Sequence, residues 1–139
     1  MRRNSLLVIA ALVAALTVSS AAVAAKGASS LSLVVVGATA NGATANAATV
    51  QPSYGGQITF DVSTNETDRP YVNVRCYQGV AFIYDSWQGF WTGYYTDPVF
   101  TLSSGYWTSG AADCTARLVY FDKSGRERTL ASTSFHVNA

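Results

Sequence analysis

The sequence predicts an all-β sandwich for the body of the chain. From Thr49 onward, apolar and polar residues alternate with a period of two, and many of the apolar ones are β-branched or aromatic. Clusters of Gly, Pro, Asn and Ser interrupt this pattern at short intervals, and no window has the apolar spacing of an amphipathic helix. Six or seven short strands in about 90 residues favour two packed antiparallel sheets over a large barrel.

The first 25 residues have the organisation of a secretory signal peptide. Two arginines precede an uninterrupted apolar run at residues 6–16, and small side chains follow at residues 22–25. The apolar run is shorter than the roughly 20 residues that a helix needs to span a bilayer. We therefore expect cleavage after Ala24 or Ala25, a secreted protein and no membrane contact after cleavage.

Residues 26–48 have the composition of a flexible arm. They are rich in Ala, Gly, Asn and Thr, and the pentapeptide GATAN occurs twice, at residues 37–41 and 42–46. The segment LSLVVV at residues 31–36 fits an edge strand equally well, and the sequence leaves both interpretations open. We place the sandwich domain at residues 49–139.

Each strand expected in this domain is bounded by a turn signal. Pro70 disfavours helix before the second strand, Gln78 and Gly79 fit a tight hairpin turn, and residues 123–126 join the last two strands as a hairpin. The expected strands cover residues 58–63, 71–77, 80–87, 99–103, 112–122 and 127–137. Alternation along them predicts which residues share a face: Val72, Val74 and Cys76 in the second strand, and Cys114, Ala116, Leu118 and Tyr120 in the fifth.

Charge and cysteine content limit the classes of function that the chain can have. Without Arg2 and Arg3 of the leader, the chain has 7 basic and 8 acidic residues, so no basic surface for nucleic acid is expected. Cys76 and Cys114 are the two cysteines, and such a pair in a small secreted domain is expected to form a disulfide. These sulfurs and one histidine are too few ligands for a tetrahedral zinc site, so we expect neither a metal nor a cofactor.

Catalytic chemistry is not favoured. His136 is the one histidine, and it lies in a terminal strand where a solvent-facing role is more common. Most carboxylates that glycoside hydrolysis would need fall in loops or beside basic residues. The spacing of Asp61, Asp68 and Asp97 does not match a calcium loop. We expect no enzyme; a small hydrolase would need a pocket that holds paired carboxylates or His136.

The segment WQGFWTGYY at residues 87–95 is unusually aromatic for a connection, and connections usually run over the surface. In one interpretation, one or two of its rings fold under the loop and cap the core. In the other, part of the set stays exposed as a contact surface for a glycan or a protein. The candidate binding residues are Trp87, Phe90, Trp91, Tyr94 and Tyr95, with Asp85, Gln88 or Asp97 as hydrogen-bonding partners of a glycan.

The segments YVNVRCY, GAADCTARLVYF and TLASTSFHV, together with the number of strands, resemble the immunoglobulin-like or fibronectin type III-like sandwich of secreted actinobacterial proteins over residues 49–137. This resemblance implies strand B at 57–64, C at 71–77, F at 112–122 and G at 127–137. It implies that the two cysteines join neighbouring strands C and F, whereas antibody domains link B to F across the sheets. Ala112 replaces the corner tyrosine of antibody domains, and Trp107 is a candidate to fill that corner.

Because this architecture hosts many unrelated functions, the resemblance implies a fold more than an activity. Our first hypothesis is a secreted, non-enzymatic immunoglobulin-like module for binding or adhesion at or near the cell surface. The alternative is a carbohydrate-binding module that uses the aromatic loop at residues 87–95. The partner is either an unknown protein or a glycan surface.

Overall fold

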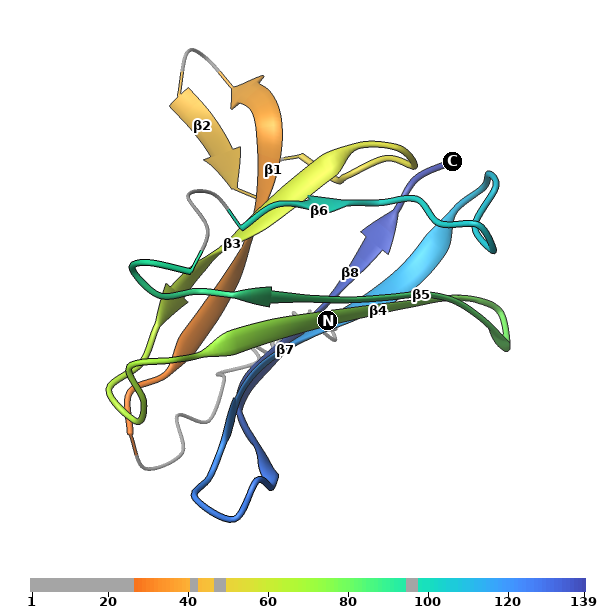
Figure 1. Cartoon of the computed structure of the whole chain (residues 1–139). Coiled ribbons are helices and arrows are strands. Elements are labelled where there is room, and N and C mark those ends of the chain that lie inside the picture. The colour runs from red at the N-terminus through yellow and green to blue at the C-terminus, as the bar shows by residue number, and fades with distance from the viewer. Residues whose placement is uncertain (1–26, 41–42, 47–49, 95–97) are drawn as a thin grey trace, which may run out of the picture.

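The computed structural model describes residues 27–40, 43–46, 50–94 and 98–139, and within these ranges the chain forms eight β-strands and no helix (Figure 1). The strands are β1 (Ser30–Ala40), β2 (Ala43–Asn46), β3 (Gln57–Ser63), β4 (Tyr71–Gln78), β5 (Ala81–Gly89), β6 (Phe100–Thr101), β7 (Ala112–Phe121) and β8 (Glu127–Val137). The expected leader, residues 1–25, lies outside the described residues.

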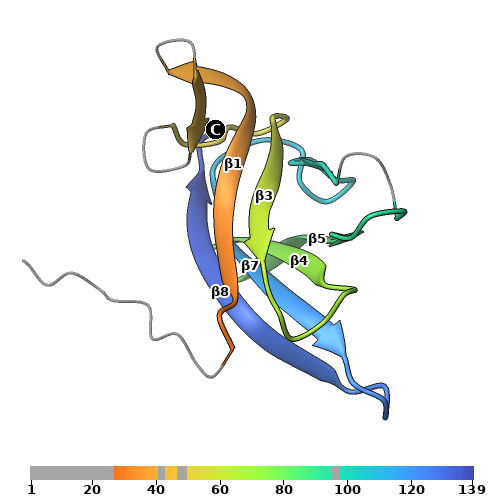
Figure 2. The same cartoon turned by 90° about the vertical axis from the view of Figure 1, so that its left-hand side faces the viewer.

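The strands form two four-stranded sheets that pack as a sandwich, as the sequence predicts. One sheet has the order β2-β1-β3-β6, the other has the order β5-β4-β7-β8, and all neighbouring strands are antiparallel. Strands β1 and β8 contact each other across the two sheets and run side by side in Figure 2. This contact closes one side of the sandwich.

Residues 31–36, for which the sequence allowed an edge strand or a flexible arm, belong to β1. Leu31 and Leu33 are buried in the core, and β1 pairs with β3 from Ser30 to Val35. Strand β2 covers the other edge of β1, so β1 is an inner strand of its sheet and not an edge strand. The sandwich therefore includes residues 30–40, which precede the domain start expected at Thr49.

The core follows the predicted alternation. Val72, Val74 and Cys76 of β4 are fully buried. The residues on the same face of the neighbouring strand β7 are buried as well: Ala112, Cys114, Ala116 and Leu118. At one end of the core lies the fully buried Trp107, whose indole nitrogen donates a hydrogen bond to the Gly110 carbonyl at 3.0 Å. The interior is thus a single apolar layer between the sheets.

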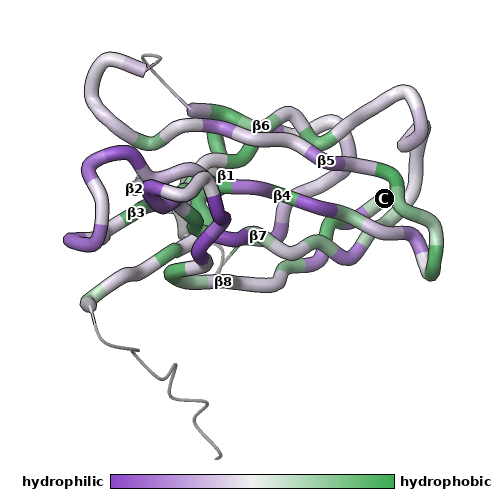
Figure 3. Tube along the Cα trace, turned by 60° about the horizontal axis from the view of Figure 1, so that its bottom comes forward, coloured by the Kyte–Doolittle hydropathy of each residue, from purple (hydrophilic) through white to green (hydrophobic). Residues whose placement is uncertain are grey.

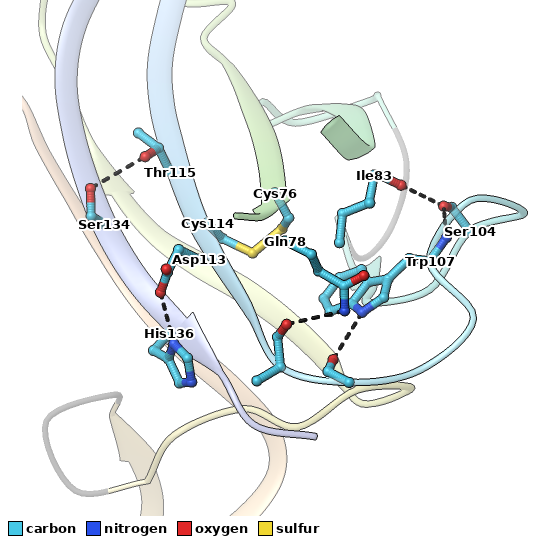
Figure 4. Close-up of a disulfide and its surroundings, with 12 residues drawn as sticks. Cys76, Gln78, Ile83, Ser104, Trp107, Asp113, Cys114, Thr115, Ser134 and His136 are labelled. Atoms are coloured by element: carbon cyan, nitrogen blue, oxygen red, sulfur yellow. Dashed lines mark hydrogen bonds and ion pairs between the residues drawn. A yellow bond between two sulfur atoms is a disulfide. The ribbon is translucent and has the colours of Figure 1, made fainter. Parts of the chain in front are cut away.

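A disulfide links the central strands β4 and β7. Cys76 and Cys114 stand directly opposite each other in the register, with their Cα atoms 4.1 Å apart and both side chains buried (Figure 4). This confirms the predicted disulfide and its position on neighbouring strands of one sheet. The bond closes a loop between residues 38 positions apart.

One carboxylate organises the β7–β8 hairpin. Asp122 accepts hydrogen bonds from the Ser124 hydroxyl at 2.5 Å, the Ser124 amide at 3.0 Å and the Arg126 amide at 3.0 Å. Its second oxygen accepts from the Arg128 Nε at 2.9 Å. These bonds, with the Ser124 hydroxyl foremost, hold the pKa of Asp122 well below its usual range. The charged carboxylate therefore helps to set the register of β7 and β8.

Removal of the disulfide is expected to destabilise the domain strongly. In the C76A/C114A variant, the free energy of unfolding should fall by about 4 kcal/mol, since the loop no longer constrains the unfolded chain. Urea denaturation of the oxidised wild type and of the variant measures this difference. Equal unfolding free energies would contradict a structural role for the disulfide.

The Asp122→Asn variant tests the turn through its pH dependence. Because the folded-state pKa is depressed, the ionised carboxylate stabilises the fold above the ordinary carboxyl pKa, and this stabilisation is lost as the pH falls through the folded-state value. Urea denaturation should show the wild type to be more stable than the variant at pH 7, with a gap that narrows below about pH 4. A gap that does not change between pH 7 and pH 2.5 would refute this account of the turn.

Candidate functional site

The aromatic loop after β5 divides between the two faces of its sheet. Phe90 turns into the sandwich, where its ring lies 6.5 Å from the rings of both Phe60 and Phe100. Trp91 and Tyr94 instead cover the outer face, with ring centroids 4.8 Å and 6.3 Å from that of Tyr71. The interpretation in which the rings cap the core thus describes Phe90. The interpretation in which they lie on the surface describes Trp91 and Tyr94.

The backbone explains how these neighbouring rings are positioned. The Phe90 amide donates a hydrogen bond to the Pro70 carbonyl at 2.9 Å, which ties the end of β5 to the loop before β4. At Gly89, a Cβ atom would collide with ring atoms of Trp91 and Tyr94, so only glycine lets these rings approach the strand.

We call the rings on this outer face the outer aromatic cluster. Its members are Tyr71, Trp87, Trp91, Tyr94 and Phe121. Phe121 joins Tyr71 at 5.7 Å and Trp87 at 6.2 Å. The sequence singled out Trp87, Trp91 and Tyr94, whereas Tyr71 and Phe121 were not recognised; Tyr95 lies outside the described residues.

The geometry of this cluster is that of packed rings. The planes of Trp91 and Tyr94 are inclined by 48°, and those of Tyr71 and Trp91 by 77°. Trp87, Trp91 and Tyr94 are half-buried. Edge-to-face contacts of this kind stabilise the rings against each other, whereas stacking on flat sugar faces favours exposed, coplanar rings.

A hydrogen-bonded polar network lies beside the cluster. The fully buried Asn73 donates from Nδ2 to Asp85 Oδ1 at 2.5 Å and accepts at Oδ1 from Arg117 Nη2 at 3.0 Å. Arg117 also donates to Glu127 at 2.6 Å, and Arg75 Nε lies 3.4 Å from Asp85 Oδ2. Both carboxylates are therefore engaged by arginine. Asp85, which the sequence offered as a glycan ligand, is part of this network.

The single histidine lies on the outer face of the same sheet, near the end of β8. His136 Nδ1 is 2.8 Å from Asp113 Oδ1 (Figure 4). Both side chains border a shallow depression of about 550 Å³. The hydroxyl of Ser134, two residues before the histidine, is hydrogen-bonded to Thr115 Oγ1 at 3.3 Å. The pair thus has a base and an orienting acid, but the serine that borders the same depression, Ser134, is hydrogen-bonded to Thr115.

Within the described residues, a groove lies between the edges of β5 and β6. It has a volume of about 780 Å³. Tyr84, Ser86 and Gln88 line it from the inner face of β5. Phe100 and Thr101 of β6, together with Val99 just before that strand, line it from the opposite side. At its rim stand Phe82 and Tyr106, whose side chains are 51% and 86% exposed.

The groove exists because the two edge strands differ in length. Strand β5 has nine residues, whereas β6 has two and pairs with β3 only at Gln57 and Ile58. Two side-chain bonds bridge the groove: Ser104 Oγ donates to the Ile83 carbonyl at 2.6 Å, and Gln88 Nε2 donates to the Val99 carbonyl at 3.3 Å. Between these bridges no strand covers the inner face of β5 within the described residues.

The groove is lined mainly by uncharged groups. Burial raises the pKa of the Tyr84 phenol, although a hydrogen bond with Ser86 acts in the opposite direction. Asp85 is the one charged residue among the described residues that line the groove, and its charge is balanced by Arg75. Next to the groove, the tip of the β4–β5 hairpin is hydrophobic and carries the fully exposed Val80 (Figure 3).

Comparison with known proteins leaves the function to be argued from this geometry. No protein-family model matches the sequence, and neither a curated protein nor a solved structure matches the chain.

In the part of the chain that the structure describes, no helix is long and apolar enough to cross a membrane. The same part holds no group of three or more His, Cys, Asp or Glu side chains that could bind a metal ion, and Asp97 lies outside it.

The division of the aromatic loop predicts different effects for two neighbouring substitutions. Phe90→Ala should lower the free energy of unfolding by about 2 to 3 kcal/mol, because it removes a ring that packs in the core. Trp91→Ala should cost about 1 kcal/mol, the size of the aromatic contacts it removes. Urea denaturation of both variants tests this order, and a larger loss for Trp91→Ala would show that the faces are assigned wrongly.

Proposed function

We propose that this chain is a secreted, non-enzymatic binding module with an immunoglobulin-like or fibronectin type III-like sandwich. The positions of β3, β4, β7 and β8 correspond to the strands B, C, F and G that the sequence resemblance implies. The disulfide joins the strands that correspond to C and F, which departs from the B–F link of antibody domains, and it is compatible with an extracellular location. The apolar run and small residues of the first 25 residues support export.

The groove beside β5 carries the proposed binding role. Its volume falls within the range of roughly 300 to 1,000 Å³ that is typical of ligand sites. Aromatic rings and a few hydroxyl and amide groups line it, which is the usual composition of such a site. A binding site of this kind does not require a reactive side chain.

A catalytic role has less support from the described residues. Asp85 and Glu127 are each paired with an arginine, so their carboxylates are held in structural contacts. The Asp113–His136 pair lies outside the residues that line the groove. A hydrolase would need one of these groups beside a bound substrate.

A carbohydrate-binding module that uses residues 87–95 is the second candidate. The outer aromatic cluster favours it, because Trp87, Trp91 and Tyr94 gather on one face and stay half-exposed. The inclination of the rings speaks against a flat sugar platform. We therefore place the glycan interpretation second to the groove.

Retention of the labelled mature protein on the cells that produce it tests the binding role. We expect saturable retention of the wild type and at least a tenfold weaker retention of Ser86→Arg, which places a long charged side chain in the groove. Ser132→Arg, the same substitution on the exposed surface of β8, is the matched control and should bind like the wild type.

Each other outcome of this experiment has a distinct meaning. Retention that is lost in Trp91→Ala but kept in Ser86→Arg would place binding on the outer aromatic cluster, and sensitivity to glycosidase treatment of the cells would then favour the glycan candidate. If the wild type shows no saturable retention, the proposed binding role, which we expect at or near the cell surface, is wrong.

A further inference from the structure

We propose that the groove binds an extended, uncharged polypeptide segment that pairs with the free edge of β5 as an additional strand. The proposal specifies the partner of the binding module and rests on that proposed function. It follows from three features of the structure: the edge of β5, the lining of the groove and the pairing of its one charged residue.

The edge of β5 lacks the protection that the other edges have. Proteins usually protect edge strands by making them short, by charged residues or proline, or by covering them. Strand β6 has two residues, β2 has four, and β8 is in contact with β1. Strand β5 has nine residues, of which one is charged and none is proline.

Apart from one residue, the outer edge of β5 has backbone groups that are available for pairing. A register shift between Cys76 and Tyr77 of β4 leaves Ile83 without a partner in that strand, and its carbonyl accepts the hydrogen bond from Ser104. From Tyr84 to Gly89 the pairing with β4 is regular, and no strand lies on the other edge within the described residues. Backbone groups on such an edge repeat at every second residue, about 6.8 Å apart, which matches an extended chain.

The side chains beside this edge select the sequence of the added strand. One face of the strand would lie over Ser86 and Gln88 and against Phe100, so small apolar or hydroxyl side chains fit there. The other face would lie beside Trp87, a member of the outer aromatic cluster. Alternate residues of the partner would thus be small on one side and apolar or aromatic on the other.

Charge determines the remaining property of the partner. Asp85 is already engaged by Asn73 and Arg75. A charged side chain of the partner that entered the groove would therefore lose water without gaining an ionic contact, and this is unfavourable. The segment inside the groove is accordingly expected to be uncharged.

A second copy of this chain is the less suitable occupant. The loop that carries Ser104 and Tyr106 reaches the β5 edge at Ile83. If two β5 edges paired, each copy would bring this loop to the same interface. A single peptide strand brings no such loop.

A phage-displayed library of 12-residue peptides, selected on the oxidised mature protein, tests the proposal. We expect enriched peptides that are uncharged in the centre and alternate between small and apolar residues. The affinity of a synthetic enriched peptide, measured by calorimetry, should fall at least tenfold in Ser86→Arg and stay unchanged in Ser132→Arg. Near-ultraviolet circular dichroism establishes that both variants are folded.

Backbone pairing is tested separately by N-methylation of the enriched peptide. Methyl groups on one alternate set of amides should abolish binding, because these amides face β5, whereas methyl groups on the other set should leave binding within about threefold. Equal binding of both methylated peptides would overturn strand addition. The proposal would also be overturned if the selection enriches no peptide although the protein is retained on its cells. In that case the proposed function stands without this partner.

Two further results would also overturn the proposal. Binding of a soluble polysaccharide that is lost in Ser86→Arg would assign the groove to a glycan. A dimer of the wild type that becomes a monomer in Ser86→Arg, seen by sedimentation equilibrium, would assign the groove to a second copy.

Discussion

The proposed binding site depends on one constraint, the unequal length of β5 and β6. These are the two edge strands at the open side of the sandwich. On the opposite side, β1 contacts β8 and closes the core. At the open side β6 ends after two residues, so side chains complete the core in place of a strand. Phe90 stacks on Phe100 there, with ring planes 19° apart, and Trp107 fills one end. What these side chains leave uncovered is the groove.

The strands and their faces could be predicted because a period of two records which side of a sheet is apolar. Val72, Val74 and Cys76 illustrate this, since all three lie in the core. Strand β1 was harder to recognise, because the apolar residues 31–36 are followed by small and polar residues that are typical of linkers. Its place between β2 and β3 depends on pairing with distant residues, which local composition does not record.

The surfaces were less predictable than the strands. Phe90 and Trp91 are neighbours of similar character, and only the fold places one in the core and the other outside. Tyr71 and Phe121 meet because of the register of β4 and β7, and the order of strands places the unequal strands β5 and β6 at the sheet edges that border the groove. Both relations join residues that are far apart in the sequence, so local sequence patterns do not indicate them. The disulfide was predictable because the chain offers one pair of cysteines.

Amide hydrogen exchange along β5 of the free, oxidised protein tests the central claim most directly. If the outer edge of β5 is unpaired, alternate amides between Tyr84 and Gly89 should exchange rapidly, while those that face β4 should exchange slowly. Slow exchange of every amide in this stretch would contradict the account, because it would mean that the edge already has a partner.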